Sequence, residues 1–131
     1  MQRVSGIGGI FFKARDAARL REWYREHLCL PVTDWGGVIF EGREARPGER
    51  QTATVWNVFS GDTRYFEPST SPFMINYRVD DLDAVLSALR AEGCEVDAQI
   101  DESEFGRFGW VMDPEGNKLE LWEPPQVPAP S

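Results

Sequence analysis

Residue types that bind metals or act as nucleophiles are scarce in this sequence. It has one histidine, His27, and two cysteines, Cys29 and Cys94, among 131 residues. The cysteines form no CxxC pair and no zinc-type spacing, which argues against a redox motif and a zinc site. His27 falls in the last turn of an expected helix, where a basic residue is favourable, so no Ser-His-Asp or Cys-His catalytic set can be built around it.

Long apolar runs and a surplus of positive charge are also missing. No stretch approaches the length that spans a bilayer, and the amino-terminal MQRVSGIGG lacks the charged-then-apolar layout of a signal peptide. The 22 acidic residues outnumber the 14 basic ones, for a formal net charge of -8. This charge repels nucleic acid and anionic membranes. We therefore expect a cytoplasmic protein with neither of these as a partner.

What the sequence does contain is enough apolar material for one packed domain. Hydrophobic residues make up 41% of the chain, and its length is typical of a single core. In the first half, period-2 and period-3.6 patterns predict strands at 7–14, 32–35, 38–41 and 52–59 and a helix at 17–28. The helix carries Leu20, Trp23, Tyr24 and Leu28 at helical spacing.

The second half repeats this order after a connector rich in Gly, Pro, Ser and Thr at 61–72. Strands are predicted at 73–79, 95–100, 106–112 and 118–123. A helix opens at Asp80 and Asp81 and ends at Gly93, a residue favoured just past a helix. Residues 113–116 read Asp-Pro-Glu-Gly, the composition of a type I turn. The proline-rich tail at 125–131 is expected to be flexible.

An internal repeat organises these elements. A shift of 65 positions places Ile10 on Ile75, Asp16 on Asp81 and Cys29 on Cys94, and one inserted residue then places Val55-Trp56 on Leu121-Trp122. We therefore predict a single domain over 1–124, with βαβββ modules at 1–60 and 73–124. Cysteines at equivalent positions of two such modules lie too far apart for a disulfide, unless both are close to the pseudo-axis.

Three segments of the chain resemble a known superfamily. They are LREWYREHLCLPV, FMINYRVDDLDAVLSALRAEGCEV and FGWVMDPEGNKLELWEP, and they occur in the expected order. Together they resemble the glyoxalase, bleomycin resistance and extradiol dioxygenase proteins, also called the vicinal oxygen chelate superfamily. The resemblance implies an α+β fold in which two tandem modules form an eight-stranded open cup. It also implies a small-molecule ligand and a homodimer, but not one chemistry, because members differ in activity.

Metal-dependent members of this superfamily hold their ion with four side chains inside the cup. Matched by motif, those positions are Gly9, Thr54, Met74 and Glu120 here, and the first and third are 65 positions apart, the second and fourth 66. Of these four residues only Glu120 is an ordinary ligand for a divalent ion, and a catalytic zinc wants three. We therefore expect no bound metal and no other cofactor.

Glu120 is the candidate catalytic residue. In an apolar cup its carboxyl group would be desolvated, which raises its pKa and suits it to act as a general acid or base, or as an anchor for a ligand. The alternative is an inherited glutamate that is hydrogen-bonded to a neighbouring strand.

Aromatic residues are the main candidates for ligand binding. Trp56 and Trp122 occupy matching positions in the repeat and are expected as facing walls for a flat ligand. Trp35 beside the Gly36-Gly37 pair is a candidate lid residue, and Arg107 is a candidate contact for an anionic group at the mouth. The full set of expected ligand-binding residues is Phe11, Trp35, Thr54, Trp56, Met74, Asn76, Arg107, Trp110, Met112 and Trp122.

Three functional hypotheses follow from these residues and the resemblance. The favoured one is a glyoxalase-like or resistance-like protein that binds a small aromatic or polar molecule without the usual metal. The alternative is a lyase or isomerase that uses Glu120, with or without a divalent metal. The third is a metal-dependent glyoxalase or dioxygenase, which would need ligands outside the four matched positions.

Overall fold

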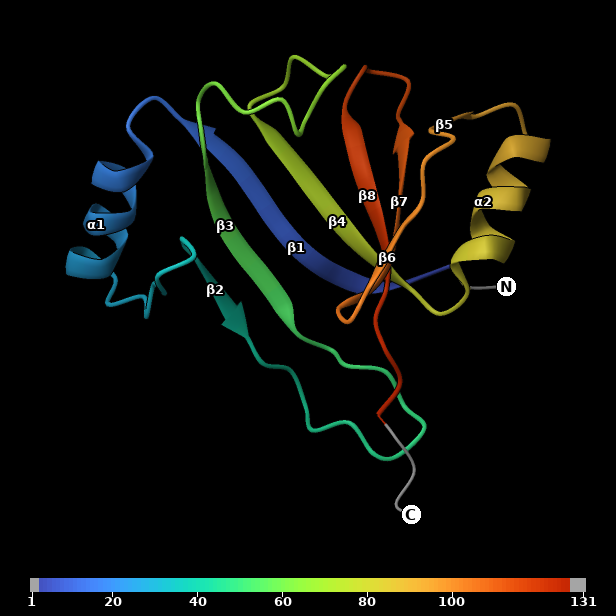
Figure 1. Cartoon of the computed structure of the whole chain (residues 1–131), viewed down its shortest axis with the longest axis horizontal. Helices are drawn as coiled ribbons and strands as arrows, with labels where there is room; N and C mark the ends of the chain where they lie inside the picture. The colour runs from blue at the N-terminus through green and yellow to red at the C-terminus, as the bar shows by residue number, and fades with distance from the viewer. Residues whose placement is uncertain (1–2, 128–131) are drawn as a thin grey trace.

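A computed structural model describes residues 3–127, which form two helices and eight strands. The first half contains β1 (Val4–Ala14), α1 (Ala17–His27), β2 (Gly37–Phe40) and β3 (Thr54–Ser60). The second half contains β4 (Phe73–Val79), α2 (Leu82–Ala91), β5 (Glu95–Val96), β6 (Asp101–Ser103), β7 (Gly106–Met112) and β8 (Lys118–Glu123). Figure 1 shows α1 and α2 at opposite ends of one curved sheet.

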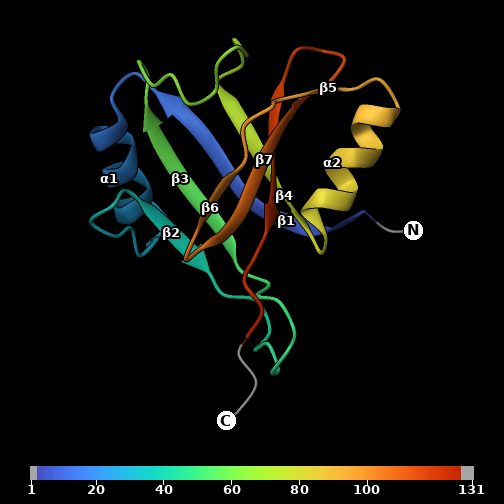
Figure 2. The ribbon, with the colours of Figure 1, turned by 45° about the vertical axis from the view of Figure 1, so that its right-hand side comes forward.

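The sheet joins the two halves of the chain through their first strands. Its order is β2-β3-β1-β4-β8-β7-β5, and β6 pairs with β7 off this path. Strands β1 and β4 are antiparallel at the centre, whereas β1 pairs with β3, and β4 with β8, in parallel. The sheet is open, and the turned view in Figure 2 shows β6 and β7 in front of β1. The expected α+β fold with an eight-stranded open cup is confirmed.

Strands are distributed unequally between the two halves. The expected strand at 32–35 is absent from the described structure, because Gly36 has a φ of +100° and both the N–H and the hydroxyl of Thr33 bond to Gly37 O. The expected strand at 95–100 is reduced to β5, and the unpredicted strand β6 follows it. The first half therefore contributes three strands and the second half five.

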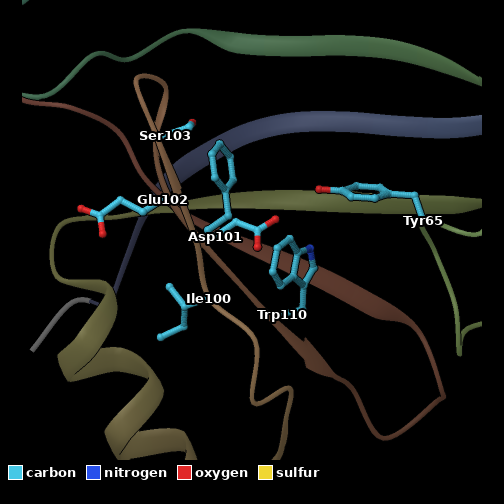
Figure 3. Close-up of a pocket in the computed structure, with 7 residues that line it drawn as sticks. Tyr65, Ile100, Asp101, Glu102, Ser103 and Trp110 are labelled. Carbon is cyan, nitrogen blue, oxygen red and sulfur yellow. The ribbon is translucent and has the colours of Figure 1, made fainter.

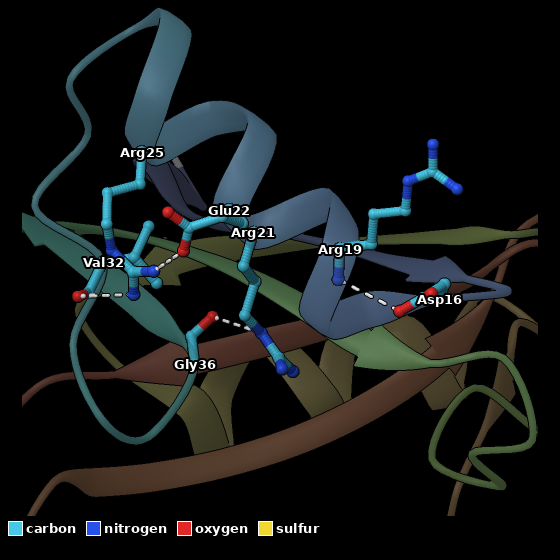
Figure 4. A network of polar contacts seen from close by, with 7 residues as sticks. All are labelled: Asp16, Arg19, Arg21, Glu22, Arg25, Val32 and Gly36. Atoms are coloured by element: carbon cyan, nitrogen blue, oxygen red, sulfur yellow. Dashed lines mark hydrogen bonds and ion pairs between the residues drawn. The ribbon is translucent and has the colours of Figure 1, made fainter.

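Helix α1 begins at its acidic cap and is tied to the sheet by arginine. Asp16 accepts a hydrogen bond from Arg19 N at 3.0 Å, the usual stabilisation of a helix N-terminus. Arg21 donates to Gly36 O at 3.1 Å and to Val58 O at 2.6 Å, so it links the helix to β3 and to the turn before β2. Figure 4 shows the Asp16–Arg19 and Arg21–Gly36 contacts together with the Glu22–Arg25 ion pair.

The second helix covers the better-packed core. Asp81 caps α2 by accepting a hydrogen bond from Ala84 N. Its apolar face packs against β7, β8 and the end of β4 in a cluster of Val79, Leu82, Val85, Leu86, Val111 and Leu121. By contrast, none of the described residues of α1 is buried, and Trp23 is 50% exposed.

The carboxyl-terminal segment is held to the body of the fold. Gln126 bridges to Arg50, and Val127 exchanges backbone hydrogen bonds with Gly48 and Glu49. Residues 128–131 lie outside the described residues, and the expected flexibility of the tail stays a prediction. Neither described helix is long and apolar enough to cross a membrane.

Candidate functional site

The concave side of the sheet encloses a cavity of about 790 Å³. Its walls come from β1, β2, β3, β4, β7 and β8, from the segments before β2, β3, β4 and β7, and from the residues after β8. They are mostly apolar and aromatic. The lining residues are Gly8, Phe11, Trp35, Ile39, Glu41, Gln51, Ala53, Val55, Asn57, Phe59, Tyr65, Asn76, Glu104, Phe105, Phe108, Glu120, Trp122 and Pro125.

Glu120 lies on the wall of this cavity with its carboxyl group almost fully enclosed. The residue is 2% exposed. Asn76 Nδ2 donates to Oε1 at 2.5 Å, Trp110 Nε1 donates to Oε2 at 3.0 Å, and the Tyr65 hydroxyl donates to Oε2 as well. Three donors from β4, β7 and the 61–72 connector therefore hold one carboxyl group from β8.

Burial changes the acidity of both members of the Tyr65–Glu120 pair. Desolvation raises the pKa of Glu120, although the hydrogen bonds from Tyr65, Asn76 and Trp110 partly oppose this. Burial also raises the pKa of Tyr65, and the negative charge of Glu120 raises it further. The hydroxyl of Tyr65 therefore stays protonated at neutral pH and acts as a donor to the carboxyl group.

A smaller cavity of about 400 Å³ adjoins the first and shares Tyr65 and Phe108 with it. Figure 3 shows it between Trp110 and the β6 segment, with Tyr65 at one end. The remaining lining residues are Ile100, Asp101, Glu102 and Ser103. The side chains of Asp101 and Glu102 give this cavity an acidic edge.

Five of the residues expected at the site lie on the main cavity wall: Phe11, Trp35, Asn76, Glu120 and Trp122. Trp122 donates from Nε1 to Phe105 O at 2.8 Å and stacks on Phe108, with ring planes 3° apart. Trp35 is 51% exposed, so it lies at the rim. Whether any of them contacts a ligand stays a prediction.

The expected placement of Trp56 and Thr54 in the cup is wrong. The ring of Trp56 packs edge-on against Phe12 and against Tyr24 of α1, on the opposite face of the sheet. Thr54 shares that face and donates its hydroxyl to Ile7 O. Residues of the other parity, Val55 among them, line the cavity instead.

The strand ladders explain this error. Phe11 pairs with Asn57, and Asn76, 65 positions after Phe11, pairs with Glu120. Asp16 and Asp81, also 65 apart, cap the two helices. The structural counterpart of Glu120 is therefore Asn57, three positions from Thr54, and an odd displacement turns a strand residue to the other face.

Four other expected ligand contacts also lie off the main cavity. Arg107 is on the α2 side of β7, where both of its terminal nitrogens pair with Asp83 at about 3 Å, so it does not reach the mouth. Met112 lies at the far end of β7, opposite Lys118. Met74 is fully buried beside Phe66 and Trp110. Trp110 lines the smaller cavity, bonds to Glu120 and packs edge-on against Tyr65.

Sequence reasoning missed Asn57 and Tyr65. Tyr65 lies in the 61–72 connector, which has few other apolar residues, and the adjacent Tyr65-Phe66 pair was a signal that this segment folds back over the sheet. Phe66 is 1% exposed, and Tyr65 stacks on Phe59 with ring planes 5° apart. In β3, Val55, Asn57 and Phe59 share one face, and Thr54, Trp56 and Val58 share the other. Both sets are suited to burial, so the sequence alone does not show which face lines the cavity.

The residues of the cup do not fit a divalent metal ion. Among residues 3–127, no three His, Cys, Asp or Glu side chains are grouped closely enough to hold one. Gly9 has no side chain, Thr54 faces away, and the Met74 sulfur is a poor ligand for a hard ion. The carboxyl group of Glu120 is already bonded by three protein donors.

Comparison with known proteins places these features among related folds. A family model described as a glyoxalase-like domain matches residues 9–122. Methylmalonyl-CoA epimerase from Streptomyces coelicolor, solved with 2-nitronate-propionyl-CoA, superposes with a TM-score of 0.65 at 17% identity, over 97% of this chain and 99% of that chain. The Mycobacterium tuberculosis methylmalonyl-CoA epimerase gives 0.58 at 18% identity, over 99% and 92%.

A dioxygenase shares the same fold in a longer chain. The 2,3-dioxygenase LapB from Pseudomonas sp. KL28 gives a TM-score of 0.61 at 20% identity, over 98% of this chain but 44% of that one. At these identities the likeness establishes the fold alone. A comparison with curated protein sequences gives no match.

Proposed function

Because this chain belongs to the glyoxalase-like domain family, we propose that it binds a small organic molecule in its cup without the usual metal. The observation that carries this proposal is the main cavity itself. Its volume of about 790 Å³ suits a molecule of two or three fused rings, since ligand pockets span roughly 300–1,000 Å³. Its walls are apolar with a few convergent polar groups, which is the usual make-up of such a site.

Flat aromatic rings form a large part of these walls. Phe11, Phe59, Phe108 and Trp122 line the cavity together. The stacked Phe108–Trp122 pair on β7 and β8 offers an extended flat surface, and aromatic side chains stabilise planar ligands by offset or edge-on contacts. The preferred ligand is therefore planar and largely apolar.

Direct titration with a neutral planar probe tests this proposal. We expect 2-naphthylmethanol to bind the intact protein with one-to-one stoichiometry, measured by calorimetry and by a change in tryptophan fluorescence. Ala53→Phe, which places a ring in the cavity, should abolish this binding while the thermal transition remains cooperative. Native mass spectrometry of freshly purified protein would reveal any molecule that co-purifies. Unchanged binding by the Ala53 variant would locate the probe elsewhere and exclude the cup.

An enzyme that uses Glu120 as a general acid or base is the second candidate. The raised pKa of Glu120 supports it, because a carboxyl group that titrates nearer neutrality exchanges protons more readily at physiological pH. The three hydrogen bonds that hold the group favour a structural role instead. Glu120→Gln separates the two: it should preserve binding of the neutral 2-naphthylmethanol in both cases and abolish turnover only in an enzyme.

The homodimer and the cytoplasmic location implied by the sequence stay predictions. Sedimentation equilibrium tests the first, with a mass of about twice 14.9 kDa expected for the dimer.

A further inference from the structure

We propose that the ligand of the main cavity is an arylalkyl amine, a planar ring system that carries an amino group on an alkyl carbon, bound as its cation. The inference rests on the proposed small-molecule binding function and specifies its ligand class. Two independent features carry it: the charges along the cavity wall, and the hydrogen-bonding groups next to Glu120.

The charged residues on the wall all have the same sign. Glu41, Glu104 and Glu120 line the cavity, and no lysine, arginine or histidine is among its lining residues within 3–127. Glu41 and Glu104 are exposed and make no ion pair within this range. A ligand that enters here meets a negative potential, which attracts cations and repels carboxylates and phosphates.

The nearest basic side chains are held by other groups. Arg78 donates to Ile7 O and Ala53 O, and Arg50 donates to Pro124 O. Both line a separate cavity beside Ser5 and Asp80. Lys118 bonds to Tyr65 O and lies over the rings of Tyr65 and Trp110, 5.5 and 5.4 Å from their centroids. Its positive charge acts on Glu120, but within residues 3–127 it forms no ion pair with Glu41 or Glu104.

Hydrogen-bond donors next to Glu120 are already used. The Tyr65 hydroxyl, Asn76 Nδ2 and Trp110 Nε1 all donate to its carboxyl group. What remains is an acceptor: Asn76 Oδ1 is buried and has no hydrogen-bond partner among the described residues. A buried acceptor without a partner is unfavourable by roughly 1–3 kcal/mol, so a ligand N–H that reached it would be stabilised.

The geometry around Asn76 Oδ1 leaves it next to the cavity. A Cβ atom built on Gly8 would lie 2.3 Å from Oδ1 and 2.7 Å from Cε3 of the Trp122 ring. Glycine at position 8 is therefore what allows the amide, the ring and β1 to approach so closely. Gly8, Asn76 and Trp122 all line the cavity, so this acceptor lies at the cavity wall.

Aromatic walls complete the environment for an organic cation. The faces of aromatic rings attract a positive charge, most strongly for tryptophan and tyrosine. Tyr65 and Trp122 both line the cavity. An ammonium group attached to a planar ring system therefore finds apolar contact for its body and acceptors and ring faces for its charge.

Three matched probes test the proposal with the intact protein: 2-naphthylmethylamine, 2-naphthylmethanol and 2-naphthoate. They share one ring system and at pH 7 are cationic, neutral and anionic. We expect the amine to bind about tenfold more tightly than the alcohol in 20 mM salt, and the acid to bind more weakly than both. The advantage of the amine should shrink at 500 mM salt, where exposed charges are screened.

Charge-removing variants identify the groups responsible. Glu41→Gln and Glu104→Gln should each lower the affinity for the amine by about threefold more than the affinity for the alcohol. Glu26→Gln on α1, outside the cavity, is the matched control and should change neither. Equal binding of amine and alcohol, or tighter binding of the acid, would overturn the assignment of a cationic ligand while leaving small-molecule binding intact. If none of the three probes binds, the proposed function itself fails.

Discussion

Cys29 follows helix α1 in a conformation that suits glycine. Its φ is +55°, in the left-handed region, and it is exposed. Members of the superfamily that the sequence resembles usually read Leu-Gly-Leu-Pro at this turn, whereas this chain reads Leu28-Cys29-Leu30-Pro31. The sequence therefore allows two outcomes. Either Cys29 is strained at positive φ, which is the outcome we predict, or the turn is relaxed and the cysteine side chain is buried. The positive φ confirms the predicted outcome.

We predict that Cys29→Gly stabilises the protein by about 0.5–1 kcal/mol. A side chain in this region is unfavourable by roughly 1–2 kcal/mol, and the greater freedom of glycine in the unfolded chain offsets part of the gain. Chemical denaturation of the two proteins side by side measures it. Cys94→Gly is the matched control: Cys94 has no positive φ, because Gly93 adopts it at +82°, so this variant should gain nothing.

Glu120 makes the stability of the protein depend on pH in a defined direction. Burial raises its pKa in the folded state, so ionisation is less favourable in the folded chain than in the unfolded one. Its contribution is therefore complete below the unfolded pKa of about 4.3 and is lost as the pH rises through the folded value. The loss is about 1.4 kcal/mol for each pH unit that separates the two pKa values.

We predict that Glu120→Gln removes this dependence. Between pH 4 and pH 8, the free energy of unfolding of the parent should fall relative to that of the variant, measured by urea denaturation at each pH. The carboxyl groups whose pKa is lowered, such as Glu49 and Asp83, act in the opposite direction, but they are common to both proteins and cancel in the difference. A constant difference across this range would mean that Glu120 titrates normally.

At the scale of the element, β3 turns its two faces to different tasks. Trp56 packs against α1, which has no buried residue of its own among those described, whereas Val55, Asn57 and Phe59 line the cavity. In β8 the pattern is reversed for the tryptophan: Trp122 faces the cavity, and Leu121 packs under α2. Two tryptophans that match in the sequence repeat therefore have different roles.

Alanine substitutions should separate these roles. Trp56→Ala is expected to lower the free energy of unfolding by about 2–3 kcal/mol, because it removes an aromatic contact between α1 and the sheet, and to leave the affinity for 2-naphthylmethanol unchanged. Trp122→Ala should weaken the free energy of binding of 2-naphthylmethanol by at least as much as it lowers the free energy of unfolding. Denaturation and titration of both variants test this. If Trp56→Ala weakens the affinity for 2-naphthylmethanol and Trp122→Ala does not, then Trp56 and not Trp122 contacts the ligand.

For the whole molecule, the absence of a metal requirement is the prediction with the widest consequence. We expect that nickel, zinc or manganese does not raise the melting temperature of the protein. A ligand that binds only the folded state, present at 100 times its dissociation constant, would add roughly 2.7 kcal/mol, a shift of several degrees that differential scanning fluorimetry detects. Such a shift with one metal, abolished by Glu120→Ala, would contradict the account of the cup given above.

Local pattern was sufficient for most of the elements. Strands β4, β7 and β8 begin and end at the predicted residues, and both helices start at the predicted acidic caps. Alternation, capping residues and turn composition are short-range signals, and they agree with one another in these segments. The repeat of 65 positions and the resemblance together predicted the two-module fold, whereas the pairing of the two halves through β1 and β4 is seen only in the structure.

Tertiary structure alone decided which residues meet in the cup. The face of β3 was ambiguous because Thr54, Trp56 and Val58 are as suited to burial as Val55, Asn57 and Phe59, and a displacement by one residue exchanges the two sets. Tyr65 reaches Glu120 across 55 positions of sequence, and no local pattern encodes a contact of that range. Arg107 pairs with Asp83 on α2 and does not face the cup. This pair depends on how the helix packs on the sheet. Sequence periodicity sets elements, whereas side-chain contacts between distant segments set the site.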